Sequence, residues 1–274
     1  MDIKNSATLK LLGLATLIII TALCSQAARA DEKGQKIAQA VYDRPDGQTA
    51  VLQTTMILRS KDASERSREF YSFRKDLNNG EILSLIRFAL PKDVKDTGLL
   101  TQSHADGTSD QWLYLPALGR ERRIAGERKG GRFVGSEIYY EDLQDRKPNQ
   151  DTHTYKGRET IEGAACDVIE SVPVDAGNST YSKRILWVHP QTLIPIRIDF
   201  YKDANDQPVK RLKVKKIENI QGNWTVIETQ ITDLQEGYET HILNHKTIYD
   251  QELPDELFSQ TTLQNPLEDQ KYRP

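Results

Sequence analysis

The chain has 274 residues, 37% of them hydrophobic, and a formal net charge of −3. That length and apolar content suffice for one sizeable core, and the slight acidity argues against a protein dedicated to nucleic acid. Of the two cysteines, Cys24 precedes the expected mature chain, so we expect no internal disulfide and interpret Cys166, in an apolar setting, as a small buried hydrophobe.

The first thirty residues have the order of a secretory signal peptide. Basic residues precede a short apolar run, Leu11–Leu23, and Ala28-Arg29-Ala30 supplies a small-x-small cleavage site. A membrane-spanning helix needs roughly 20 apolar residues, so an uncleaved anchor is the less favoured alternative. A lipid-modified Cys24 fits poorly because a bulky leucine precedes it. We therefore predict cleavage after Ala30, a periplasmic product, and a single domain over residues 31–274.

The mature chain is predicted to begin with one helix and to continue as strands. Ile37, Ala38, Val41 and Tyr42 form one face of a short helix within residues 31–43. After a Pro-Asp-Gly turn, β-rich runs separated by polar turns continue almost to the C-terminus. We expect about eleven antiparallel strands, and the clearest are Ala50–Arg59, Ser67–Lys75, Glu81–Leu90, Gly98–Ser103, Thr160–Val172, Ser182–His189, Val209–Ile220, Trp224–Leu234 and Tyr238–Tyr249.

One further run, residues 194–201, has the cleanest alternation between an apolar face and the opposite face. Ile194, Ile196, Ile198 and Phe200 are expected on one face of a half-solvated antiparallel strand. Meandering strands of this kind curl into a barrel or a strongly bent sheet, and nothing in the sequence marks a second domain. Residues 263–274 are predicted to form a polar, frayed tail.

No catalytic or metal-binding pattern survives a check of its geometry. His241 and His245 are four residues apart, but on a predicted strand that separation spans about 13 Å, too far to share one ion. Ser72-Phe73-Arg74-Lys75 matches the S-x-x-K pattern of penicillin-recognising enzymes, yet the partner triplets are absent and the segment is predicted to be a strand. We therefore predict that the protein is not an enzyme and that it has neither a metal site nor a cofactor.

The stretch Gln111–Tyr140 is predicted to form a strand, a basic turn and a second strand. Between Arg120 and Arg132 lie six basic and two acidic residues, an asymmetry on an acidic protein. We predict that Arg120, Arg122 and Arg123 dock lipid headgroups or an acidic partner, with a solvated hairpin as the alternative. The flanking aromatic residues are candidates either for an apolar cavity or for the core, and they are Trp112, Tyr114, Phe133, Tyr139 and Tyr140.

The amino-acid sequence of this stretch is also specific enough to suggest a family. It contains QWLYLPALGR at Gln111–Arg120, RRI at Arg122–Ile124, FVGSE at Phe133–Glu137 and YEDL at Tyr140–Leu143, with supporting fragments at 88–95, 97–100, 186–188 and 194–197. These phrases resemble the exported outer membrane lipoprotein-sorting protein family, which is LolA-like. One departure is FVGSE, where the family would have Met and Asp around the Gly-Ser pair.

The resemblance implies an α+β, mainly antiparallel β fold. Its form would be a bent, incomplete β-barrel with covering helices and a hydrophobic cavity between the helices and the sheet. Members of the family are similar to periplasmic carriers of lipoproteins or other lipidic ligands, and many work with resistance-nodulation-division type exporters.

We therefore expect a periplasmic, non-enzymatic carrier for a lipid or acylated, lipoprotein-like ligand, in which each buried CH₂ contributes about 0.8 kcal/mol. The expected partners are acyl chains and an inner-membrane exporter or outer-membrane acceptor, without nucleic acid. The alternative is an accessory protein-interaction subunit of such an exporter without its own lipid cargo. The candidate cavity residues are Trp112, Tyr114, Phe133, Ile196, Ile198 and Phe200.

Overall fold

The structure, a computed structural model, describes residues 31–202 and 206–274. The predicted signal peptide and its cleavage after Ala30 lie outside the described residues. The predicted N-terminal helix is present over residues 31–42, and thirteen strands follow it in one antiparallel sheet.

The strands are β1 (Thr49–Arg59), β2 (Glu65–Asp76), β3 (Ile82–Leu90), β4 (Gly98–Ser103), β5 (Ser109–Leu115), β6 (Arg120–Arg123), β7 (Asp151–Ile161), β8 (Ala164–Pro173), β9 (Lys183–Val188), β10 (Pro195–Tyr201), β11 (Lys210–Ile220), β12 (Asn223–Asp233) and β13 (Glu239–Tyr249). The short helices are η1 (Pro116–Leu118), η2 (Gly126–Arg128), η3 (Phe133–Gly135), η4 (Tyr140–Leu143), η5 (Pro148–Gln150), η6 (Ala176–Asn178), η7 (Asp255–Phe258), α2 (Gln260–Gln264) and η8 (Gln270–Tyr272).

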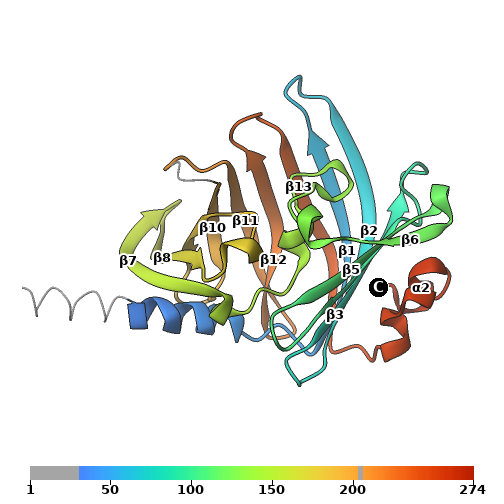
Figure 1. The fold of residues 1–274 in the computed structure, drawn as a ribbon, viewed down its shortest axis with the longest axis horizontal. Coiled ribbons are helices and arrows are strands. Elements are labelled where there is room, and N and C mark those ends of the chain that lie inside the picture. The colour runs from blue at the N-terminus through green and yellow to red at the C-terminus, as the bar shows by residue number, and fades with distance from the viewer. Residues whose placement is uncertain (1–30, 203–205) are drawn as a thin grey trace, which may run out of the picture.

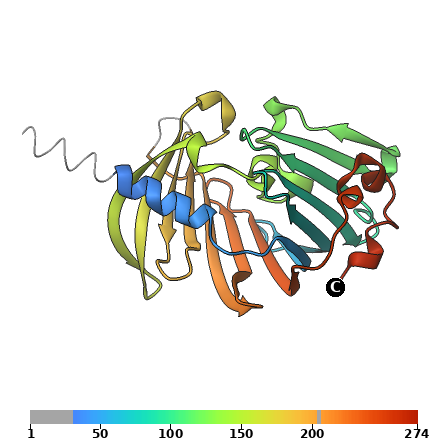
Figure 2. The same ribbon diagram turned by 90° about the horizontal axis from the view of Figure 1, so that it is seen from below.

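The order of the strands explains the shape of the sheet. Strands that are consecutive in the chain pair with one another, except that β1 pairs with β13, and β6 and β7 lie at opposite edges. Because β6 and β7 follow one another in the chain, the connector between them, residues 124–150, crosses the concave side from one edge to the other (Figures 1 and 2). The predicted fold class, a bent and open antiparallel sheet with few helices, is confirmed.

The strand count exceeds the expected eleven for identifiable reasons. The run Thr160–Val172 is divided between β7 and β8 by a turn at Glu162 and Gly163, both of which have positive φ. The basic segment expected as a turn is the edge strand β6, a place where exposed charges deter pairing with other chains. The second strand expected towards Tyr140 is wrong, because that segment forms η3 and η4 inside the bend.

Alternate residues of each strand point to opposite sides of the sheet. In the β1–β5 half both sets of alternate residues are largely apolar, so both faces carry a buried cluster. The outer face packs against the C-terminal segment, and its buried cluster is Val51, Phe73, Leu85, Leu100, Leu253, Leu257, Phe258 and Leu263. The inner face packs against the connector, and its buried cluster is Met56, Leu58, Phe70, Phe88, Val94, Leu99, Leu113 and Phe133. Two layers therefore cover one sheet.

The C-terminal segment is not the frayed tail that its polarity predicts. Arg87 of β3 and Asp269 form an ion pair with a 3.1 Å N–O distance, and both side chains are 0% exposed. Arg87 also donates hydrogen bonds to the carbonyl oxygens of Thr262 and Leu263, each at 2.9 Å. This clamp fixes α2 and η8 on the outer face of the sheet, to the right in Figure 2.

Candidate functional site

A cavity of about 600 Å³ lies on the concave side of the sheet. Strands β7 to β12 form its floor, the connector forms its roof, and the N-terminal helix closes one side. Its volume falls within the roughly 300–1,000 Å³ typical of small-molecule sites.

The floor combines an apolar row with a polar row, and the pairing register of the strands produces both. One row of directly opposed residues is aliphatic and consists of Ile169, Leu186, Ile198, Leu212 and Ile231. The next row lies two residues further along each strand and consists of His153, Ser171, Arg184, Phe200 and Lys210. Side chains two apart on a strand share a face. The floor is therefore amphipathic.

The N-terminal helix covers one end of the apolar row. Ala38 packs with Ile169 and Val188 in one cluster, and Val41 contacts the same cluster. The helix lies close to β7 at Gly34, where an added Cβ would be 2.7 Å from the carbonyl oxygen of His153. Glycine is required there because the two backbones nearly touch.

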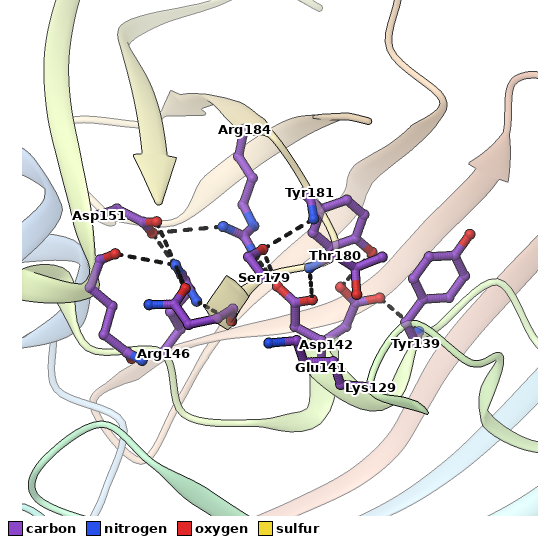
Figure 3. A network of polar contacts seen from close by, with 12 residues as sticks. Lys129, Tyr139, Glu141, Asp142, Arg146, Asp151, Ser179, Thr180, Tyr181 and Arg184 are labelled. Atoms are coloured by element: carbon purple, nitrogen blue, oxygen red, sulfur yellow. Dashed lines mark hydrogen bonds and ion pairs between the residues drawn. The ribbon is translucent and has the colours of Figure 1, made fainter. Parts of the chain in front are cut away.

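The connector is fastened to the sheet through Glu141, as Figure 3 shows. Its carboxylate accepts hydrogen bonds from Arg184 Nη2 (2.5 Å), the Ser179 hydroxyl (2.5 Å) and the Thr180 backbone N–H (2.6 Å). Burial alone would raise the pKa of Glu141, but these hydrogen bonds and the charge of Arg184 hold that pKa below its usual value. Glu141 is therefore ionised and serves as a latch between the roof and β9.

A second fastening lies beside it. Asp142 accepts hydrogen bonds from Lys210 Nζ (2.5 Å), the Tyr181 hydroxyl (2.9 Å) and the Tyr139 backbone N–H (2.7 Å). The rings of Tyr139 and Tyr181 stack at 5.9 Å, and Lys210 Nζ lies 4.0 Å from the Tyr139 centroid. Burial lowers the pKa of Lys210, against the opposing charge of Asp142, and burial raises the pKa of the Tyr181 hydroxyl.

The β7 end of the polar row is held in the same way. Arg146 donates to both oxygens of Asp151, at 2.6 and 2.8 Å. His153 is buried between the Ser171 hydroxyl (2.8 Å) and the Pro148 carbonyl oxygen (2.9 Å), and burial lowers its pKa. Arg146 and Asp151 therefore pair with each other, whereas His153 pairs with a hydroxyl and a backbone carbonyl.

Among residues 31–202 and 206–274, no three His, Cys, Asp or Glu side chains are grouped closely enough to hold a metal ion. No helix in the same ranges is long and apolar enough to span a membrane.

Several known proteins share this fold. A family model whose description reads only "uncharacterized protein" matches residues 80–265. An outer membrane lipoprotein-sorting protein domain from Vibrio parahaemolyticus, so described provisionally, is 29% identical with a TM-score of 0.81, covering 86% of this chain and 100% of that one. A DUF1329 family protein from Desulfovibrio piger is 29% identical with a TM-score of 0.81, covering 85% and 99%.

A LolA superfamily protein from Nitrosomonas europaea shares the fold at 18% identity, with a TM-score of 0.66 and coverage of 82% and 97%. The chain belongs to the LolA-like, outer membrane lipoprotein-sorting family. No functionally curated protein matches it.

Of the residues expected to line a cavity in this LolA-like protein, two do so. Ile198 and Phe200 stand on the cavity floor. Ile196 does not share their face, because a register shift between Pro195 and Arg197 interrupts the alternation of β10. Ile196 instead packs outside, with Trp187.

The three aromatic candidates lie elsewhere. Trp112 and Tyr114 pack against the outer cluster beneath the C-terminal segment. Phe133 is buried in the inner core, 5.7 Å from the Phe88 ring and 5.8 Å from the Tyr140 ring. These positions favour the core interpretation over the cavity interpretation for all three.

The three arginines of β6 are exposed on the edge strand but do not share one face. Arg120 and Arg122 stand opposite Leu115 and Leu113, and Arg123 stands opposite Trp112. Arg122 also borders a second hollow, of about 950 Å³. Arg128 and Lys129 also border this hollow, together with Glu127, and its apolar lining includes Leu113 and Leu115.

Sequence reasoning missed the residues that join strands into a site. Leu186, Arg184 and Glu141 were not selected, because a single strand's alternation does not show which residue it faces on the next strand. Leu212 also lines the cavity floor. Glu141 belongs to the YEDL segment, residues 140–143, and its buried contact with Arg184 gives a structural reason for a glutamate at that position.

Proposed function

We propose that this protein is a periplasmic, non-enzymatic carrier that holds the acyl chain of a lipid or lipoprotein-like ligand in the concave cavity. The observation that supports this most directly is the row of five aliphatic side chains facing a cavity of about 600 Å³. Burying an acyl chain there contributes about 0.8 kcal/mol for each CH₂. The name of the Vibrio protein, a lipoprotein-sorting domain, and the predicted signal peptide agree with this role.

Release of the ligand would need movement of the roof. The latch at Glu141 and the contacts of Asp142 hold the connector down, so a partner that displaces them would open the cavity. We propose the exposed arginines Arg120, Arg122 and Arg123 as the contact for an exporter, an outer-membrane acceptor or lipid headgroups. An exporter subunit without cargo is the competing role, since the edge strand alone would serve it.

The test is native mass spectrometry of the protein isolated from its own periplasm, with two matched variants. Ile198→Trp fills the cavity floor, whereas Ile196→Trp places the same bulk on the other face of the same strand. We expect co-purified lipid on the wild type and on Ile196→Trp, and at least a tenfold loss on Ile198→Trp. Lipid-free wild-type protein that does not take up added lipid would contradict the carrier role and leave the exporter subunit.

Docking is tested separately by reversing the three arginines of β6 to glutamate. Binding to anionic vesicles or to an isolated partner should fall, while the melting temperature stays unchanged. The control reverses Lys215, Lys216 and Lys246, which stand on strands far from β6 in the sheet order. Equal loss in both variants would mean that net charge alone, and not this edge, matters.

A further inference from the structure

The buried atoms of the cavity lining that make no hydrogen bond are all donors, among the described residues. Among the described residues, four buried side-chain atoms lack a hydrogen-bond partner, and two of them belong to the cavity lining. These two are Arg44 Nε and Arg184 Nη1, and both are guanidinium donors. The nearby carboxylates are satisfied, since Glu141 accepts three hydrogen bonds and Asp151 accepts two from Arg146.

Arg184 Nη1 is placed to donate a further hydrogen bond. Its residue is only 9% exposed, and Nη2 is fixed by Glu141 at 2.5 Å and by the Ser179 hydroxyl at 2.9 Å. Figure 3 shows the guanidinium between that pair and Asp151. Nη1 forms a long ion pair with Asp151 Oδ2, at 3.7 Å, and donates no hydrogen bond. The guanidinium is therefore oriented before any ligand arrives.

The position of Arg184 also relates it to the apolar row. Leu186 lies two residues along β9, roughly 6.6 Å away at strand spacing, and shares the inner face. A ligand group at Arg184 could therefore continue directly as a chain over Leu186, Ile198 and Leu212. A buried guanidinium binds an anionic oxygen more strongly than a neutral one, because such hydrogen bonds are charge-assisted.

We propose that the cavity selects amphiphiles with an anionic head, a carboxylate or a phosphate, which binds Arg184 Nη1 while the chain lies on the apolar row. This inference rests on the proposed carrier function and adds the class and orientation of the ligand. Neutral lipids would enter the same cavity but leave the donor without a partner.

The experiment compares four probes with the same sixteen-carbon chain on delipidated wild-type protein, below their micelle concentrations. Hexadecanoate, hexadecyl phosphate, hexadecanol and hexadecyltrimethylammonium each displace a neutral fluorescent probe, N-phenyl-1-naphthylamine. We expect at least one anion to bind tenfold or more tightly than hexadecanol, and the cation to bind weakest. The tighter of the two anions then assigns carboxylate or phosphate.

A pair of variants locates the effect. Arg184→Lys keeps a charge for Glu141 but loses the forked donor, and should reduce the ratio of anion affinity to hexadecanol affinity at least fivefold. Arg197→Lys is the control, because Arg197 stacks on Trp187 at 4.1 Å on the outer face. Equal binding of all heads to the wild type would overturn the proposal and leave the carrier role standing. Failure of every probe to bind would defeat the carrier role itself.

Discussion

Removing one partner of the buried Arg87–Asp269 pair should destabilise the whole protein. In Asp269→Ala, the Arg87 guanidinium stays buried against carbonyl oxygens but loses its counter-charge at 3.1 Å. Arg273, which contacts Asp269 at 2.7 Å, loses the same partner. Breaking a buried ion pair in this way costs about 3–5 kcal/mol, because an uncompensated charge remains inside.

The magnitude can be checked in two independent ways. For a chain of this size, 1 kcal/mol corresponds to roughly 2–4 °C in melting temperature, so the expected drop is about 6–20 °C. Urea unfolding followed by circular dichroism should show the same loss of free energy. The double variant Arg87→Met/Asp269→Leu leaves no unpaired charge at the fully buried Arg87 position, although Arg273 still loses its partner. Part of the lost stability should therefore return.

The control is the surface pair Arg158–Asp167, in which the Arg158 side chain is 65% exposed. Arg158→Met should change the free energy of unfolding far less than Asp269→Ala does, because water screens an exposed ion pair. If Asp269→Ala costs no more than this control, the C-terminal segment does not clamp the outer face as described.

Three further predictions concern the inner face and the connector. Burial lowers the pKa of His153 below its usual value of about 6.5, so the unfolded chain binds a proton at this imidazole more readily than the folded chain does. Stability should therefore fall as the pH drops below about 6.5. His153→Gln should make that fall smaller in urea titrations from pH 7.5 to 5.0. Burial raises the pKa of Glu137 despite Arg132, so the stability that Glu137 contributes is lost as the pH rises from its unfolded pKa to its folded pKa. Glu137→Gln should therefore be at least as stable as wild type at pH 7, and a clear loss in thermal melts would contradict this. Gly34→Val should cost about 1–3 kcal/mol by forcing the N-terminal helix away from β7, whereas Gly126→Ala, which has no atom within 4 Å of its added Cβ, should be neutral.

The sequence allowed the strands to be predicted well, because alternation in a half-buried strand is a local property. The run that gives β10 shows both the strength and the limit of that signal. Its position was predicted correctly, but a bulge beside Ile196 turns that side chain to the other face, and no local pattern marks it.

The site was less predictable because it depends on contacts between distant segments. Arg184 meets Glu141 only because the connector crosses the bend, and neither residue shows this in its own neighbourhood. The C-terminal tail misled for a related reason. Its polar composition conceals Asp269, whose partner Arg87 is an alternating residue of a distant strand.

The central claim is that an acyl chain lies along the inner apolar row, and photo-crosslinking measures this most directly. Palmitate analogues with a diazirine at successive chain positions would be irradiated on the protein and the adducts mapped by peptide mass spectrometry. We expect adducts on inner-row residues such as Leu186, Ile198 and Leu212, and these adducts should move along the row as the diazirine moves along the chain. Adducts concentrated on the outer face around Trp112 and Tyr114 would contradict it.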